Sequence, residues 1–465
     1  MTAITASKQL WRHELAATMA LAWPLIIAQV AGILLFTTDV VMMGWLGPTQ
    51  LAAGTLATSL MHPIFLGGLG VVTATAPMIA QAIGAREGRS VRRTVRQGFW
   101  AALLLAVLIA PLLFNAERLF LSLGQNPEVS ALAQGYLHFA VGAVLPGLLI
   151  VPLRSLLQAR GNPTIILYLT VAGIFVNALG NYALIFGNFG FPRLELAGAG
   201  ISTSFVNWVM LFLALGFVLF HKRYRRFYIL VRLWKPDWPR FRDIFRIGIP
   251  IGLTLMSEVG MFGVAVIMMG WLGTNQVAAH AVALQCAAIA FMVPLGLSQA
   301  TTVRVGLFMG ALNAEGVRKA GWTSLALTIA FMSATCALFL LAPDLLVRLF
   351  LDPLKPENAI SLGLAGAYLG IAALFQLVDG TQCIMGAALR GMSDTRVPMV
   401  FALIGYWVIG LPVGYIAGFV FGLEGVGIWL GLATGLTVAA IALTARFALR
   451  DRLGLMQRDS IVVTS

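Results

Sequence analysis

Charged residues are scarce in this sequence, and long stretches contain none. Asp, Glu, Lys and Arg make up 11% of the 465 residues, whereas 59% are hydrophobic. No soluble core could hide so much apolar surface, so the composition excludes a soluble globular protein and indicates a polytopic membrane protein. The length accommodates about a dozen spans of roughly 20–25 residues joined by short loops.

Cysteine is also rare, because Cys286, Cys336 and Cys383 are the only three and each lies inside an apolar run. An odd number in such positions excludes a disulfide framework and a metal cluster. The five histidines show no metal-binding spacing and no catalytic triad, and no phosphate-binding glycine loop is present. We therefore expect no cofactor and no direct use of ATP.

Two further patterns are missing. The net charge is +13, yet no polar segment interleaves basic and aromatic residues, so we expect no nucleic-acid partner. The N-terminal residues 1–15 are polar, and no small-residue cleavage site follows before Asp39. We expect the first apolar run to be retained as a span rather than removed as a signal peptide.

Apolar runs long enough to span a membrane as α-helices occur twelve times, and none shows the alternation of a barrel strand. The predicted fold class is an all-α polytopic membrane protein with twelve transmembrane helices. The expected spans lie near 17–45, 51–80, 95–116, 130–152, 163–187, 196–220, 244–270, 277–303, 319–342, 358–388, 397–420 and 424–448.

Basic residues alternate between the two sides of these spans. Of the 31 Lys and Arg residues, all but Arg118, Arg193, Arg348 and Lys355 fall at the N-terminus or in every second loop. Because positive charge collects on the cytoplasmic side, we expect both termini to be cytoplasmic and the membrane to be the inner membrane of a bacterium.

An internal repeat divides the chain. Val40–Gly47 recurs as Val266–Gly273 with seven of eight residues identical, and the same offset of 226 relates Arg92 to Arg318. The repeated unit contains six spans, so both halves have the same orientation and are related by an axis along the membrane normal. Such symmetry suits a transporter that rocks about a central site.

The repeat also predicts the domain boundaries. We expect an N-terminal six-helix bundle over 1–220, a basic cytoplasmic linker over 221–246, a C-terminal six-helix bundle over 247–450 and a cytoplasmic tail over 451–465. Two parallel repeats of this kind predict a V-shaped pair of bundles with a central cleft for the substrate.

Only three acids lie deep inside apolar runs: Asp39, Glu258 and Asp379. A charged group at this depth costs roughly 2.5–3.5 kcal/mol on insertion scales and marks a functional site by default. Each acid breaks the repeat, because their counterparts are Ala265, Gly32 and Leu149 respectively. The alternative is a buried acid that pairs with a neighbour for packing alone.

No Lys or Arg is expected at matching depth in the same spans. A carboxyl group buried in a medium of low dielectric constant can hold a proton, and two converging carboxylates can share a proton or a monovalent cation. Oxygen ligands suit hard cations such as Na⁺. We therefore predict coupling to Na⁺ or H⁺ at Glu258, Asp379 and Asp39, with a possible Na⁺ between the first two.

Polar and soft side chains surround these acids in the sequence. Candidate supporting groups are Asn177, Asn181, Thr203 and Gln285, with interhelical hydrogen bonding as the alternative for each. Candidate residues of an adaptable substrate cavity are Phe36, Phe262, Phe291 and Met292, with lipid contact or helix packing as the alternative.

Several motifs together resemble the multidrug and toxic compound extrusion (MATE) transporters. They are Asp39 ahead of Met43-Gly-Trp-Leu-Gly47, Ser257-Glu258, Val277-Ala-Ala-His280, Val378-Asp-Gly-Thr-Gln382, Gly386-Ala-Ala-Leu-Arg-Gly391 and Tyr406–Tyr415. The resemblance covers roughly residues 10–450, and the acids of the seventh and tenth spans resemble the NorM-type branch. Ala281 departs from the family, which often has Gln there.

The resemblance implies a secondary active antiporter that exports cationic, amphipathic drugs in exchange for Na⁺ or H⁺. It implies a second-lobe cation site at Glu258 and Asp379, and a first-lobe site at Asp39 with Asn177, Asn181 and Thr203. We expect a monomer in contact with membrane lipid. Two alternatives are a lipid-linked oligosaccharide flippase, which would favour a basic cavity, and an intramembrane enzyme, for which no motif surrounds the acids.

Overall fold

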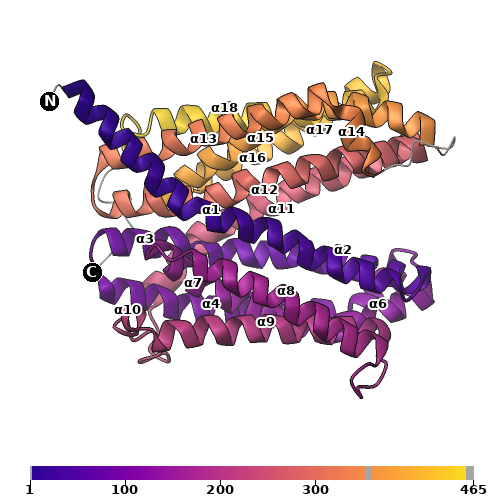
Figure 1. Cartoon of the computed structure of the whole chain (residues 1–465), viewed down its shortest axis with the longest axis horizontal. Coiled ribbons are helices and arrows are strands. Elements are labelled where there is room, and N and C mark those ends of the chain that lie inside the picture. The colour runs from indigo at the N-terminus through magenta and orange to yellow at the C-terminus, as the bar shows by residue number, and fades with distance from the viewer. Residues whose placement is uncertain (1–2, 351–357, 457–465) are drawn as a thin grey trace. The chain divides into compact units, whose positions relative to one another are not determined.

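The chain folds into α-helices joined by short loops (Figure 1). The computed structural model describes residues 3–350 and 358–456, so Lys355 and the end of the predicted tail lie outside the described residues. No β-strand occurs within those described ranges. Among the described residues, twelve helical segments are long and apolar enough to cross a membrane, which confirms the predicted fold class.

The helices of the first half are α1 (Ala3–Gly44), α2 (Pro48–Thr73), α3 (Thr75–Gly84), α4 (Gly88–Phe114), α5 (Ala116–Ser122), α6 (Pro127–Ala140), η1 (Val141–Ala143), α7 (Val144–Ala159), α8 (Thr164–Phe186), α9 (Glu195–Phe220) and α10 (Lys222–Arg225). Those of the second half are α11 (Trp238–Leu272), α12 (Thr274–Gly310), α13 (Ala314–Leu341), α14 (Pro343–Arg348), α15 (Ala359–Gly391), α16 (Arg396–Leu403), η3 (Ile404–Gly410), α17 (Leu411–Tyr415), η4 (Ile416–Val420) and α18 (Glu424–Ala448).

Prolines interrupt some spans without ending them. The span Pro48–Gly84 breaks at Ala74 between α2 and α3. Pro77 lacks an N–H for the carbonyl four residues earlier, and its ring crowds that carbonyl, so the helix changes course nearby. Pro412 lies between the two π-helical stretches η3 and η4 of the eleventh span.

The backbone repeats as the sequence does. Gly47 and Gly273 precede α2 and α12 with φ of 120° and 126°, values at which a side chain would strain the backbone. The loops that end α3 and α12 also match, because Arg86 and Leu312 have φ of 60° and 55°. The duplicated sequence therefore encodes the same sharp breaks at the same places in both halves.

Contacts within the chain define two compact units, and their boundaries differ from the predicted ones. Unit 1 contains the described residues up to Ile26 and those from Leu253 onward, and unit 2 contains Ile27–Gly252. The first part of α1 thus packs with the second half of the chain in unit 1, and the first part of α11 packs with the first half of the chain in unit 2.

Close glycine contacts explain these assignments. In unit 2, a Cβ added to Gly70 would lie 2.4 Å from Gly252 Cα, so α2 and α11 meet backbone to backbone. In unit 1, a Cβ added to Gly296 would lie 2.6 Å from Ile26 Cα, and Gly296 is the repeat counterpart of Gly70. Small residues permit such approaches between membrane helices. The sequence repeat shows the glycines, but it does not show which helices they face.

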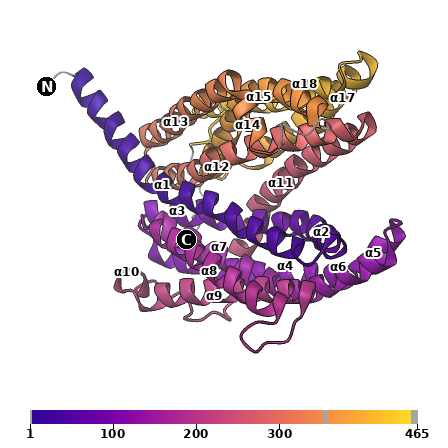
Figure 2. The ribbon, with the colours of Figure 1, turned by 45° about the vertical axis from the view of Figure 1, so that its right-hand side comes forward.

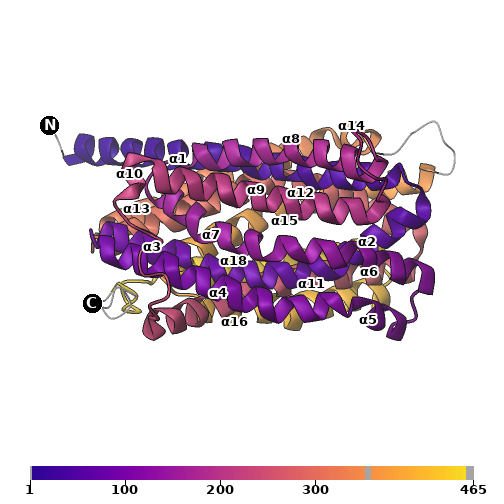
Figure 3. The ribbon, with the colours of Figure 1, turned by 90° about the horizontal axis from the view of Figure 1, so that it is seen from below.

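The predicted linker folds onto unit 2. Arg96 of α4 donates through Nη1 to the carbonyl oxygen of Arg232 at 2.8 Å, and Trp100 donates through Nε1 to that of Leu233 at 2.9 Å. Arg93 pairs with Asp237 at 2.5 Å. The segment is therefore a structured part of the unit at the end where Figures 2 and 3 show α3 and α10.

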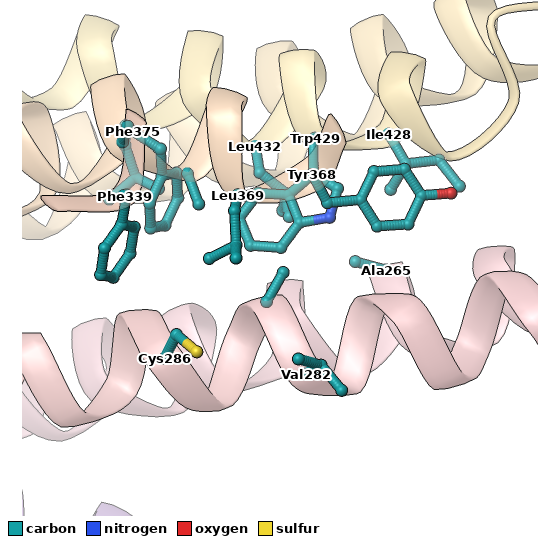
Figure 4. Packing of buried hydrophobic residues seen from close by; sticks show 14 of the residues in the cluster. Ala265, Val282, Cys286, Phe339, Tyr368, Leu369, Phe375, Ile428, Trp429 and Leu432 are labelled. Carbon is teal, nitrogen blue, oxygen red and sulfur yellow. The ribbon is translucent and has the colours of Figure 1, made fainter. Parts of the chain in front are cut away.

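Buried aromatic side chains organise the core of unit 1 (Figure 4). The Trp429 ring centroid lies 5.6 Å from that of Phe375 and 6.5 Å from that of Tyr368. Ala265, the counterpart of Asp39, is fully buried in this cluster. Leu149, the counterpart of Asp379, packs against the corresponding core of unit 2. At each of these two positions, one half of the chain therefore has an apolar core residue where the other half has an acid.

Candidate functional site: a carboxylate pair in unit 1

Two of the three predicted acids come together inside unit 1. Glu258 lies on α11 and Asp379 on α15, and their carboxyl groups interact electrostatically. Asp379 is 6% exposed, whereas Glu258 is half-buried. Gln382, one helical turn after Asp379, interacts with both acids. Tyr406 of η3 donates its hydroxyl to Gln382 Oε1 at 3.0 Å. The pair is thus held by three elements that are distant in the sequence.

A second contact fixes the neighbour of Glu258. Trp407 donates its indole N–H to Ser257 Oγ at 2.6 Å. Gly260, one turn later on α11, makes room for the indole, because a Cβ there would lie 3.0 Å from Trp407 Cζ2. Tyr406 and Trp407 both lie on the π-helical stretch η3, and π-helical turns often occur at functional sites.

Asp379 has an oxygen without a hydrogen-bond donor. Its Oδ1 atom is buried, and no donor among the described residues reaches it. Buried polar atoms are hydrogen-bonded in the great majority of cases, and each exception calls for an explanation. Such an oxygen can accept a proton or a small cation, and the carboxyl group of Glu258, which lies within electrostatic range, offers further oxygen atoms.

Arg390 affects the acid pair from the end of its span. It lies in the last turn of α15 rather than at the depth of the acids, and its charge acts on Glu258 and Cys383. It follows Asp379 by eleven residues, about three helical turns, so both project from the same face of α15.

Asp39 has a different environment in unit 2. Asn177 and Asn181 of α8 donate to its Oδ1 atom through Nδ2 at 3.0 Å and 2.6 Å. Thr203 donates instead to the carbonyl oxygen of Ala199 at 2.9 Å and does not bond to Asp39. The i, i+4 spacing of the two asparagines thus places both amides on the acid.

Tyr136 is a member of this site that no sequence pattern predicts. It is buried in α6, interacts with Thr203 and lies near enough to Asp39 to feel its charge. Thr203 therefore acts in this site through Tyr136 rather than directly. No local signal marks Tyr136, because only the packing of α6 against α9 brings it there.

The remaining predicted residues are spread over both units. Gln285 is exposed on α12, and none of the hydrogen bonds among the described residues joins it to Glu258 or Asp379. Phe262 packs on the unit 1 core with its ring 6.1 Å from that of Phe375. Phe291 and Met292 are half-buried in unit 1, and Phe36 is 53% exposed in unit 2. Their role in a substrate cavity stays a prediction.

Cysteine and metal chemistry are limited as well. The three cysteines are buried and free. Within the part of the chain that the structure describes, no group of three or more His, Cys, Asp or Glu side chains could hold a metal ion. The acid pair offers carboxylate oxygens, which suit a proton or a hard cation.

Comparison with known proteins assigns these features to a family. The sequence model of the MatE family matches residues 24–183 and 250–416. A relative from Mesorhizobium japonicum named "Probable multidrug resistance protein NorM" is 44% identical over 450 residues and covers 96% of both chains. A relative of the same name from Rhizobium meliloti is 44% identical over 437 residues and covers 94% of both. The crystal structure of a eukaryotic MATE transporter has the same fold, with a TM-score of 0.86, 20% identity, and coverage of 97% of this chain and 99% of the other.

Proposed function

This chain belongs to the MatE family of membrane transporters, and we propose that it is a secondary active multidrug efflux antiporter that exchanges organic compounds for Na⁺ or H⁺. It is a transporter and not an enzyme. The relatives named multidrug resistance protein support drug-like substrates. The buried acids support substrates that are cationic and amphipathic, and they disfavour the pyrophosphate of a lipid-linked oligosaccharide.

The observation that carries the proposed coupling is the buried Oδ1 of Asp379, which lacks a donor and lies within electrostatic range of a second carboxylate. A coupling ion must bind in one state and leave in another, so its site needs a group that gains a partner only when the ion is present. The oxygen of Asp379 is such a group. Gln382 and Tyr406 hold it in place without satisfying it.

The energy for export comes from the ion gradient. One net elementary charge that crosses a potential of 100 mV releases about 2.3 kcal/mol, enough for roughly a fiftyfold gradient of an uncharged substrate; one-for-one exchange with a monovalent cationic substrate moves no net charge and uses the concentration gradient of the ion instead. The basic loops support an inner-membrane protein with both termini in the cytoplasm, in which an inward ion drives drug outward. The protein functions in this proposal as a monomer surrounded by membrane lipid.

Transport in proteoliposomes tests the proposal. Purified protein should expel a fluorescent cationic dye when a Na⁺ gradient or a proton gradient is imposed separately, and one of the two should suffice. Glu258→Gln and Asp379→Asn should each abolish the gradient-driven part of transport. If both variants retain transport and its ion dependence, the acid pair is not the coupling site.

A further inference from the structure

A cavity lined by arginines lies at the end of unit 2 that the sequence predicts to be cytoplasmic. Its volume is about 560 Å³, and it is bounded by the end of α3, the start of α4, the end of α7 and the segment after α10. Figures 1 and 3 show α3 and α10 at this same end. The charged residues that line it are Arg86, Arg89, Arg92, Arg160, Arg226 and a single acid, Glu87.

The charge of this cavity is not neutralised from within. None of the five arginines forms an ion pair with a described residue. The Nε atoms of Arg92 and Arg160 are buried and have no acceptor. Arg160 and Arg226 instead lie over the Phe227 ring, each 5.6 Å from its centroid. A buried guanidinium N–H without an acceptor is costly, and a bound anion would supply the acceptor.

Other arginines at this end of unit 2 have partners. Arg93 pairs with Asp237 at 2.5 Å, and Arg240 donates through Nη2 to Ser90 Oγ at 2.8 Å. Glu87, the one acid of the cavity, accepts a hydrogen bond from Ser90 at 2.6 Å. Arg154, outside the cavity, also has a buried Nε atom without an acceptor, so what distinguishes the cavity is that five arginines and only one acid line it.

The repeat provides an internal comparison. The offset of 226 relates Arg86 to Leu312 and Arg89 to Glu315 in unit 1, although the two loops have the same backbone. Glu315 pairs with Lys319 at 2.7 Å. The same loop in unit 1 is therefore neutralised by its own residues. Arg92 recurs as Arg318, whereas the rim arginines Arg86 and Arg89 do not recur, so the repeat itself does not require the full set of arginines in unit 2.

The surroundings suit a ligand at the membrane surface. Gly88 begins α4, a helix of 27 residues, and the unpaired N–H groups at such a start favour an anion. Trp234 and Trp238 of the neighbouring segment are 77% and 64% exposed. Exposed tryptophan side chains are typical of the level of the lipid headgroups.

We propose that this cavity binds the phosphate group of an anionic ligand, supplied either by a phospholipid headgroup of the adjoining leaflet or by a soluble phosphate. Guanidinium groups match phosphate oxygens in geometry and charge, and basic pockets between membrane helices take anionic headgroups. Arg92 and Arg160 form the inner contacts, and Arg86, Arg89 and Arg226 form an exposed rim. This role is independent of the ion and drug sites proposed above.

Native mass spectrometry of the full-length protein tests the proposal with three probes: phosphatidylglycerol, phosphatidylcholine and inorganic phosphate. Wild type should retain phosphatidylglycerol or inorganic phosphate in preference to phosphatidylcholine. Arg92→Gln should weaken that binding about fivefold, and Arg92→Gln with Arg160→Gln about 25-fold. Arg318→Gln is the matched control, because it removes one charge at the counterpart of Arg92 and should leave binding unchanged.

The outcomes separate the sources of phosphate and decide the proposal. Binding of phosphatidylglycerol but not of inorganic phosphate assigns the site to lipid, and the reverse assigns it to a soluble phosphate. Arg89→Gln on the exposed rim should also weaken binding about fivefold, and it keeps the test valid if the double variant fails to fold. Equal binding of phosphatidylcholine, or an equal loss in Arg318→Gln, would overturn the proposal.

Discussion

Asparagine substitution should have opposite effects on stability at Asp379 and at Asp39. Asp379 presents a buried oxygen without a donor and faces Glu258. Asparagine has nearly the same shape, and its amide can donate to Glu258, so Asp379→Asn removes an unfavourable contact between two carboxyl groups and adds a favourable one. Asp39 instead accepts two amide hydrogen bonds, from Asn177 and Asn181.

The hydrogen bonds at each acid determine how much the free energy of unfolding should change. Relief of one unsatisfied buried polar group is worth about 1–3 kcal/mol, so Asp379→Asn should raise the free energy of unfolding by about that amount. At Asp39 the amide oxygen of asparagine can still accept, but the charge that strengthens both bonds is lost. Because a hydrogen bond to a charged group is worth roughly twice a neutral one, Asp39→Asn should lower the free energy of unfolding by about 1–3 kcal/mol.

Thermal unfolding in detergent without Na⁺, followed by tryptophan fluorescence, measures both shifts. Asp379→Asn should raise the unfolding temperature while it abolishes gradient-driven transport in proteoliposomes. This combination distinguishes a binding group from a structural one, because a structural acid would lose stability and transport together. A lower unfolding temperature for Asp379→Asn, with that for Asp39→Asn unchanged, would refute the assignment of the unsatisfied oxygen to unit 1.

Two further variants test the packing around the site and between helices. Trp407→Phe removes the hydrogen bond to Ser257 at 2.6 Å. The variant should lower the free energy of unfolding by about 1 kcal/mol and slow gradient-driven dye export. An unchanged export rate would show that Trp407 does not help to position the acid pair. Gly70→Ala places a Cβ 2.4 Å from Gly252 Cα and should abolish the monodisperse peak in size-exclusion chromatography. The control, Gly135→Ala, has no atom within 4 Å of the added Cβ and should stabilise α6 by about 0.5–1 kcal/mol. Equal behaviour of the two glycine variants would contradict the close contact.

The helices could be predicted because the bilayer leaves little choice. A run of twenty apolar residues must satisfy its backbone hydrogen bonds internally, so length and composition together predict a helix. The same reasoning identified the acids, since a charge inside such a run is conspicuous. The i, i+4 spacing of Asn177 and Asn181 likewise predicts a shared face, and the structure places both amides on Asp39.

Partners from distant parts of the chain could not be predicted in this way. Gln382 and Tyr406 belong to motifs that the sequence analysis singled out, but their contact depends on the packing of η3 against α15. Tyr136 carries no signal at all. The unit boundaries at Ile26 and Gly252 depend on which helix each glycine meets. These features are tertiary, and a repeat offset relates equivalent positions without placing them against their neighbours.

The two halves carry their acids at different positions of the repeat, and the environments of these acids bear on which half binds the ion. Asp39 occupies the position of a core alanine, Ala265, and receives two fixed donors. Asp379 occupies the position of Leu149, and one of its oxygens receives none. The Oδ1 atom of Asp39, which has two donors, gains little from a further partner, whereas the buried Oδ1 of Asp379 gains a full interaction when an ion enters. A ligand shifts a conformational equilibrium only by its difference in affinity between states. The larger difference is available in unit 1, so the same duplicated scaffold can use one half to bind the ion and the other to remain constant while it does so.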